Sequence, residues 1–169
     1  MTTTGIYRQL VSADQRANRG YPKSQLILLL FRVTQCVREL RCGSRGAKAL
    51  YPFVAALYKI ASEWILGVEL PASTRCGPGL RLRHGVGVVV NPGSVIGANV
   101  MIRHGVTLGN RRSVDDCPEI EDDVEIGVGA VIIGDVTVGK GAKIGPNVVV
   151  VKDVPAGAVL YSPPSAVRE

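Results

Sequence analysis

The chain has 169 residues, of which 46% are hydrophobic and 20% charged, so it is long enough for one soluble domain with a substantial core. Its net charge of +6 is uneven, because residues 1–67 carry ten Lys and Arg against three Asp and Glu, whereas residues 68–169 carry ten against eleven. The sequence has no nucleic-acid-binding motif, no signal-peptide pattern and no apolar run long enough to span a bilayer, so we expect a cytoplasmic protein without a nucleic-acid partner.

Residues 1–67 are predicted to form an α-helical N-terminal segment. One helix is expected over residues 24–41 with Ser24 as its N-cap, and a second from about Ala47 to Leu66, where Gly67 ends it. The apolar stripe of the first helix comprises Leu26, Leu29, Leu30, Val33, Cys36, Val37 and Leu40. We expect this stripe to pack on the rest of the chain or on a neighbouring subunit. The basic surplus of the segment also leaves open a weak contact with a membrane surface.

A six-residue repeat follows from Ile96 onward. An aliphatic residue recurs at the first position, glycine at the second and a small apolar residue at the fifth, and this pattern is typical of parallel β-helices. The first position holds Ile96, Ile102, Leu108, Ile120, Ile126, Ile132, Val138, Ile144 and Val150. Each repeat would form a short strand and a corner eased by glycine, and three repeats would form one triangular coil. The sequence therefore predicts a mainly β fold, a parallel β-helix over residues 68–169.

The repeat is interrupted twice. Cys76, Leu82 and Val88 also step by six, but two residues out of phase with Ile96, which indicates a two-residue insertion near residues 88–90. Residues 110–119 hold no repeat and are polar with a proline, so they are predicted to project outward as a loop. Loops on a rigid scaffold are a common place for chemistry.

The candidate catalytic residues are the chain's two histidines, His84 and His104, which lie outside the inward-facing columns and each precede a glycine. Histidine suits general-base work because its ordinary pKa lies near neutrality. His84 lies beside the first interruption, and the nearest upstream carboxylate that could orient it is Glu69. His104 is either a supporting residue or a corner residue that hydrogen-bonds to backbone.

Other reactive side chains carry weaker signals. Cys117 could act as a nucleophile, although only Arg111 and Arg112 lie near it in the sequence to lower its pKa. Lys143 is either a solvated corner lysine or a contact to an anionic cofactor. The four cysteines form no pair with zinc spacing, so no metal site is expected.

The stretches LRLRHGVGVVVNPGSVIGANVMIRHGVTLGN, CPEI and IGVGAVIIGDVTVGKGAKIGPNVVVVKDVP together resemble the serine acetyltransferase family of hexapeptide acyltransferases. They are most similar to the short members found in polysaccharide gene clusters. The resemblance implies a left-handed β-helix, a homotrimer with active sites between subunits, and acetyl-CoA as the acetyl donor.

The same resemblance implies roles for particular residues. His84 matches the catalytic base, and Glu69 stands where the family has an orienting aspartate. Backbone N–H groups near Gly109 and Asn110 would stabilise the oxyanion. The positions that match the lining of the family's coenzyme A groove are Val128, Lys143 and Pro146.

Three positions depart from the family pattern. Arg83 replaces an aspartate beside the catalytic histidine, Asp116 replaces the arginine that meets serine's carboxylate, and Cys117 replaces a second histidine. The Asp116 carboxylate would repel the carboxylate of serine, which binds at this place in the family. Together with the charge change at Arg83, this favours another acceptor, a sugar or glycan precursor. The sequence thus predicts an acetyl-CoA-dependent O-acetyltransferase. The alternatives are a serine O-acetyltransferase, an amino-sugar N-acetyltransferase, a non-catalytic β-helix scaffold and a membrane-surface adaptor.

Overall fold

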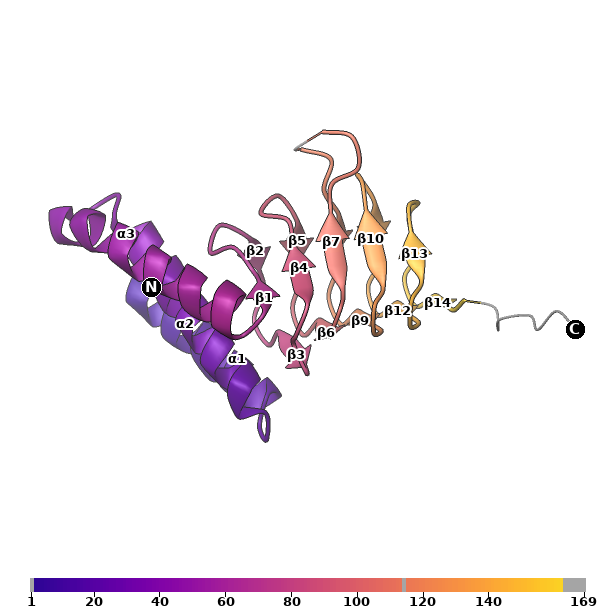
Figure 1. Ribbon diagram of the computed structural model, residues 1–169, viewed down its shortest axis with the longest axis horizontal. Coiled ribbons are helices and arrows are strands. Elements are labelled where there is room, and N and C mark those ends of the chain that lie inside the picture. The colour runs from indigo at the N-terminus through magenta and orange to yellow at the C-terminus, as the bar shows by residue number, and fades with distance from the viewer. Residues whose placement is uncertain (1, 114, 163–169) are drawn as a thin grey trace, which may run out of the picture.

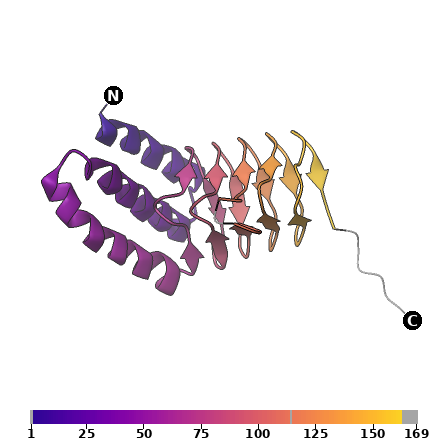
Figure 2. The same ribbon diagram turned by 90° about the horizontal axis from the view of Figure 1, so that it is seen from above.

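The computed structural model describes residues 2–113 and 115–162, in which three helices cover one end of a three-sided β-solenoid (Figure 1). The helices are α1 (Thr3–Ala17), α2 (Pro22–Leu40) and α3 (Arg45–Lys59), and the π-helical turn η1 (Ile60–Ile65) continues α3. They lie side by side in one layer, with α2 between the other two (Figure 2). None of the helices within the described residues is long and apolar enough to cross a membrane.

The solenoid has three parallel sheets, one for each side of the prism. The first contains β1 (Val68–Glu69), β4 (Val88–Val90), β7 (Thr107–Gly109), β10 (Val131–Ile133) and β13 (Val149–Val150). The second contains β2 (Arg75–Cys76), β5 (Val95–Ile96), β8 (Glu119–Ile120) and β11 (Thr137–Val138). The third contains β3 (Arg81–Arg83), β6 (Met101–Arg103), β9 (Glu125–Ile126), β12 (Lys143–Ile144) and β14 (Val159–Leu160).

The repeat columns form the core as the sequence predicts. Parallel pairing places each first-position aliphatic directly over its counterpart in the next coil, as Ile102 lies over Ile126. Both side chains are fully buried, and the fifth-position residues, such as Val100 and Val124, are buried beside them. Each coil therefore buries its apolar side against the coils above and below it.

Glycine recurs at the second position of the repeat for a different reason from the expected easing of the corners. Gly97 and Gly127 do not adopt the left-handed conformation. A Cβ at either position would instead come within 2.7 Å of the backbone of the next coil. The left-handed corner positions are taken by other residues, among them Asn99, Asp123 and Asn147. Glycine in this column thus permits the coils to approach closely and does not shape the corners.

The helical segment differs from the prediction in its start. The helix α1 was not predicted from the sequence. The helix α2 begins at Pro22, two residues before the expected N-cap. Ser24 lies inside the helix, where its buried hydroxyl donates a hydrogen bond to the carbonyl of Leu82 at 2.7 Å. Gly67 has a φ of +68° and ends the second helical stretch as expected.

The apolar stripe predicted for α2 faces outward. Leu26 and Val33 are 48% and 44% exposed. The face that packs on the solenoid is the other one, and it is partly polar. Its buried residues are Ser24, Ile27, Leu28, Phe31, Arg32, Thr34 and Gln35. The stripe thus packs on the rest of this chain only in part, through residues such as the half-buried Leu30, and its packing on a neighbouring subunit stays a prediction.

A buried ion pair fastens the helices to the first coil. The Arg32 Nε donates to Asp14 Oδ2 at 2.8 Å, and both side chains are almost fully buried. Asp14 Oδ1 accepts from the backbone N–H groups of Gly79 and Leu80, and the other Arg32 nitrogens donate to backbone carbonyls of the same coil, including that of Gly77. The inner face of the helices thus meets this end of the solenoid through polar contacts as well as through the buried apolar side chains of α2.

Candidate active site

The His84 corner lies between β3 and β4, where the first coil is longer than the later ones. Strand register pairs Leu82 with Ile102 and Val90 with Leu108, so eight residues separate the first two inward positions and six separate the second two. The two extra residues thus lie in the corner of residues 84–87, and the expected insertion at 88–90 is corrected to this place. The corner is made possible by Gly85 and Gly87, both of which have positive φ.

His84 itself has a φ of +65°, which is uncommon outside glycine. Its side chain is exposed, and its ring lies edge-on to that of His104, with ring centroids 5.9 Å apart. Because Arg83 pairs with Arg103, the two histidines occupy equivalent places in successive coils. The corner therefore presents two imidazoles together on the outside of the prism.

The helical segment forms a wall of this corner through Tyr21, a residue that the sequence analysis missed. The Tyr21 ring lies edge-on to His84 at 6.2 Å between centroids. The Arg83 guanidinium lies 4.1 Å from the centroid of the same ring, and its Nη2 donates to the carbonyl of Ala17. No sequence signal identifies Tyr21, because its place depends on how the junction of α1 and α2 meets the first coil.

Arg83 is thus held in place and is not a free surface charge. Its Nη1 is buried and has no hydrogen-bond partner among the described residues. A buried donor without a partner is costly. The expected role of Arg83 in binding the acceptor remains a prediction, and its position beside His84 is compatible with that role.

Glu69 lies on β1 and does not orient His84 directly in this chain. No hydrogen bond joins the two side chains among the described residues. Glu69 lines a groove of about 420 Å³ on the first sheet, which also contains Gly109 and Asn110. The proposed carboxylate and the proposed oxyanion donors therefore share one groove.

Gly109 and Asn110 lie at the far end of the first sheet from His84. His84 precedes β4, whereas Asn110 follows β7, which pairs with β4 in parallel. A strand length thus separates the expected general base from the expected oxyanion donors within one chain. Cys117, near the end of the segment that follows Asn110, also lies at this far edge, because its thiol contacts Asn91, which follows β4.

Two residues of that segment have local roles. Asp116 Oδ2 accepts from the backbone N–H of Arg112, and the Cys117 thiol donates to Asn91 Oδ1 at 3.2 Å. Desolvation raises the pKa of the Cys117 thiol, and the neighbouring carboxylates of Asp116 and Asp115 raise it further. A thiol with a raised pKa is a poor nucleophile at neutral pH, which argues against covalent catalysis at Cys117.

The three expected coenzyme A positions come together. Val128, Lys143 and Pro146 line one groove of about 410 Å³ on the third sheet. Arg103 lines the same groove and adds a second basic side chain that the sequence analysis did not select. The groove lies near the histidine corner, because Gly129, next to Val128, donates its backbone N–H to the carbonyl of His104.

Neither groove contains a metal-ligand cluster. No group of three His, Cys, Asp or Glu side chains within residues 2–113 and 115–162 is placed to hold a metal ion. The site contains a pair of imidazoles, which can transfer protons, and two basic side chains and backbone N–H groups, which can bind anions.

Comparisons with known proteins find hexapeptide transferases and acetyltransferases. Residues 118–152 match the family model described as bacterial transferase hexapeptide (six repeats). The chain is 37% identical to the protein named "Putative colanic acid biosynthesis acetyltransferase WcaB" of Escherichia coli K12, over 92% of this chain and 96% of that one. It is 39% identical to a serine acetyltransferase of Bacillus pumilus, over 68% of this chain and 54% of the relative.

A solved structure shows the same architecture. Serine acetyltransferase of Neisseria gonorrhoeae in complex with serine aligns with a TM-score of 0.74 and 32% identity, over 95% of this chain and 68% of that one. The left-handed β-helix implied by the sequence resemblance is thereby confirmed. The chain spans nearly the whole of the Escherichia coli relative but only about half of the Bacillus relative.

Proposed function

The chain belongs to the bacterial hexapeptide transferase family, and from this premise we propose that it transfers the acetyl group of acetyl-CoA to a hydroxyl group of a sugar or glycan precursor. The observation that carries the proposal is the His84 corner. An exposed imidazole is held there in an unfavourable backbone conformation, next to a groove with two basic side chains. Strained residues held in place by their surroundings are concentrated at functional sites.

The chemistry is a direct transfer with His84 as general base. His84 takes the proton from the acceptor hydroxyl as its oxygen attacks the thioester carbonyl carbon of acetyl-CoA. The resulting oxyanion is stabilised by backbone N–H groups near Gly109 and Asn110. The tetrahedral intermediate then expels the thiolate of coenzyme A, which takes the proton from the His84 imidazolium. The products are the acetyl ester and coenzyme A, and no covalent enzyme intermediate is needed.

The coenzyme would lie in the groove on the third sheet. Lys143 and Arg103 supply positive charge for its phosphates, and Val128 and Pro146 supply apolar contacts for the rest. The nearness of this groove to the His104 carbonyl supports a path along which the thioester reaches the two imidazoles.

A homotrimer with shared active sites is part of the proposal. Within one chain a strand length separates His84 from Gly109 and Asn110. A neighbouring copy packed beside the histidine corner would bring its own far edge to His84. Closed cyclic assemblies bring different surfaces of identical copies together in this way.

The acceptor class rests on two observations. The relative that matches almost the whole chain is named for biosynthesis of colanic acid, which favours a carbohydrate acceptor. Asp116 introduces a carboxylate where the family's arginine meets serine's carboxylate, and Arg83 reverses a second charge. Serine O-acetylation remains the second candidate, favoured by the 39% identity to a serine acetyltransferase.

A thiol-release screen distinguishes these acceptors. Purified protein with acetyl-CoA is offered L-serine, simple sugars and nucleotide-sugars, and free coenzyme A is measured. We expect turnover with a carbohydrate acceptor and little with L-serine. Robust serine turnover would show that Asp116 and Arg83 do not exclude serine. An alkali-stable product on an amino-sugar would indicate N-acetylation, and no release with any acceptor would favour a scaffold.

A further inference from the structure

The helical layer carries an apolar surface that nothing in the described chain covers. One helix face of α3 and η1 exposes Leu50, Phe53, Leu57, Ile60 and Trp64, spaced by three and four residues. Phe53 is 74% exposed and Trp64 82%. We call these five residues the α3 stripe. Large apolar side chains in such a row on a soluble surface mark an interaction site.

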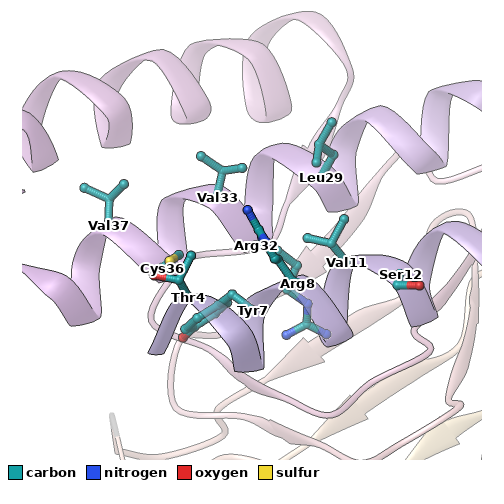
Figure 3. Close-up of a pocket in the computed structure, with 10 residues that line it drawn as sticks. All are labelled: Thr4, Tyr7, Arg8, Val11, Ser12, Leu29, Arg32, Val33, Cys36 and Val37. Carbon is teal, nitrogen blue, oxygen red and sulfur yellow. The ribbon is translucent and has the colours of Figure 1, made fainter. Parts of the chain in front are cut away.

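A second apolar feature lies on the neighbouring helix. The outward-facing Leu29 and Val33 of α2 contribute to a hollow of about 400 Å³ between α1 and α2, which is also lined by Tyr7 and Val11 of α1 (Figure 3). Figure 3 shows Leu29, Val33 and Val37 projecting from the same side of α2. Exposed apolar surface thus extends over more than one helix of the layer.

The positive charge of residues 1–67 favours an anionic partner. All three acidic residues of residues 1–67 are in ion pairs, with Arg32, Arg38 and Lys59. Seven basic residues are left without an ion pair among the described residues. They are Arg8, Arg16, Arg19, Lys23, Arg41, Arg45 and Lys48. Arg41 ends α2, and Arg45 and Lys48 lie in the first turn of α3, before the α3 stripe. The Arg41 guanidinium also lies 4.7 Å from the centroid of the Tyr51 ring.

We propose that the α3 stripe and its flanking basic turn bind the surface of an anionic phospholipid bilayer. Apolar side chains would enter the boundary between head groups and acyl chains, and the arginines and lysine would meet acidic head groups. Tryptophan at the end of the stripe suits this boundary, because its ring is apolar and its N–H is polar. A second copy of the chain is a poorer partner, since docking through this surface would bring two strongly basic segments together.

The chain contains one tryptophan, Trp64, which makes the test direct. Full-length protein is mixed with vesicles of phosphatidylcholine alone or of phosphatidylcholine with phosphatidylglycerol. We expect co-sedimentation and a shift of Trp64 emission to shorter wavelength with the anionic vesicles only. Raising the ionic strength from about 0.01 M to about 1 M, which shortens the screening length from about 30 Å to about 3 Å, should release most of the protein.

Variants separate the apolar and basic contributions. Phe53→Ser with Leu57→Ser should weaken vesicle binding by about tenfold or more, because two large apolar groups no longer enter the boundary. Arg45→Glu should weaken binding by about fivefold or more, since each basic residue near such a surface contributes about that factor. The matched controls are Val149→Ser, an equally exposed apolar position on the last coils, and Lys152→Glu. Both should bind vesicles like the unaltered protein.

Three results would overturn the proposal. The first is no binding to anionic vesicles. The second is binding that leaves Trp64 emission unchanged or that survives loss of Phe53 and Leu57. The third comes from sedimentation velocity without lipid. If the variant with Phe53→Ser and Leu57→Ser dissociates to a smaller oligomer while its vesicle binding is unchanged, another copy of the chain covers the α3 stripe. Unaltered circular dichroism spectra and acetyl-CoA binding confirm that each variant is folded.

Discussion

The positive φ of His84 makes the position of its imidazole depend on the residues around it. A left-handed conformation at a residue with a Cβ costs about 1–2 kcal/mol, so the rest of the corner must hold it. The rings of Tyr21 and His104 lie edge-on to its imidazole and restrict it. The imidazole is therefore positioned before any substrate arrives, which lowers the cost of reaching the reactive geometry.

The first prediction concerns this residue. His84→Asn should lower turnover by about a hundredfold or more, because the general base is lost. Asparagine is the better replacement, since it tolerates positive φ more readily than alanine does. Thiol release from acetyl-CoA with the acceptor found in the screen measures the effect, and thermal melting should be unchanged. Near-normal turnover by the folded variant would remove His84 from the mechanism.

At the scale of elements, the repeat was predictable and the packing of the helices was not. Each coil contacts mainly its neighbours, so a column of aliphatic residues such as Ile96, Ile102 and Leu108 is enough to define inward positions. For α2, the apolar stripe is the stronger signal in the sequence, yet the solenoid receives the face with Arg32 and Gln35. Polar groups of the first coil decide this, because its backbone offers buried donors and acceptors that require partners.

The second prediction tests that anchoring. Arg32→Met should lower the free energy of unfolding by about 3–5 kcal/mol, because it leaves the Asp14 carboxylate buried without its partner. Combining it with Asp14→Asn should recover part of the loss, since an amide oxygen can still accept from Gly79 and Leu80. Urea denaturation of the unaltered protein, the two single variants and the double variant gives the coupling energy of this double-mutant cycle.

The exposed pair of Lys59 and Glu63 provides the control for that cycle. Lys59→Met should change the free energy of unfolding by less than about 1 kcal/mol, as is usual for pairs in water. Losses of the two single variants that add up to the loss of the double variant would show that Asp14 and Arg32 are not coupled.

At the scale of the whole molecule, the parts of the site follow from topology. A solenoid places successive coils in register, so His84 and His104 meet, as do Val128, Lys143 and Pro146 in one groove. The same rigidity keeps Asn110 at the opposite edge of a sheet from His84. Sequence reasoning could find these residues individually, but in the proposed trimer their assembly requires a second copy, and no pattern within one chain encodes the distance between copies.

The last prediction tests the shared site. Asn110→Pro removes a backbone N–H proposed for the oxyanion, and His84→Asn removes the base, so each variant alone should be nearly inactive. If each site takes His84 from one copy and Asn110 from the next, subunit exchange between the two variants creates some complete sites. Random mixing in equal amounts makes about a quarter of the sites complete, because each site needs two independently drawn intact residues. If the site lies within one chain, every chain in the mixture carries a defect and no activity returns. Turnover recovered after subunit exchange therefore distinguishes the two arrangements. The unmixed variants are the activity control, and sedimentation checks that the mixture is trimeric.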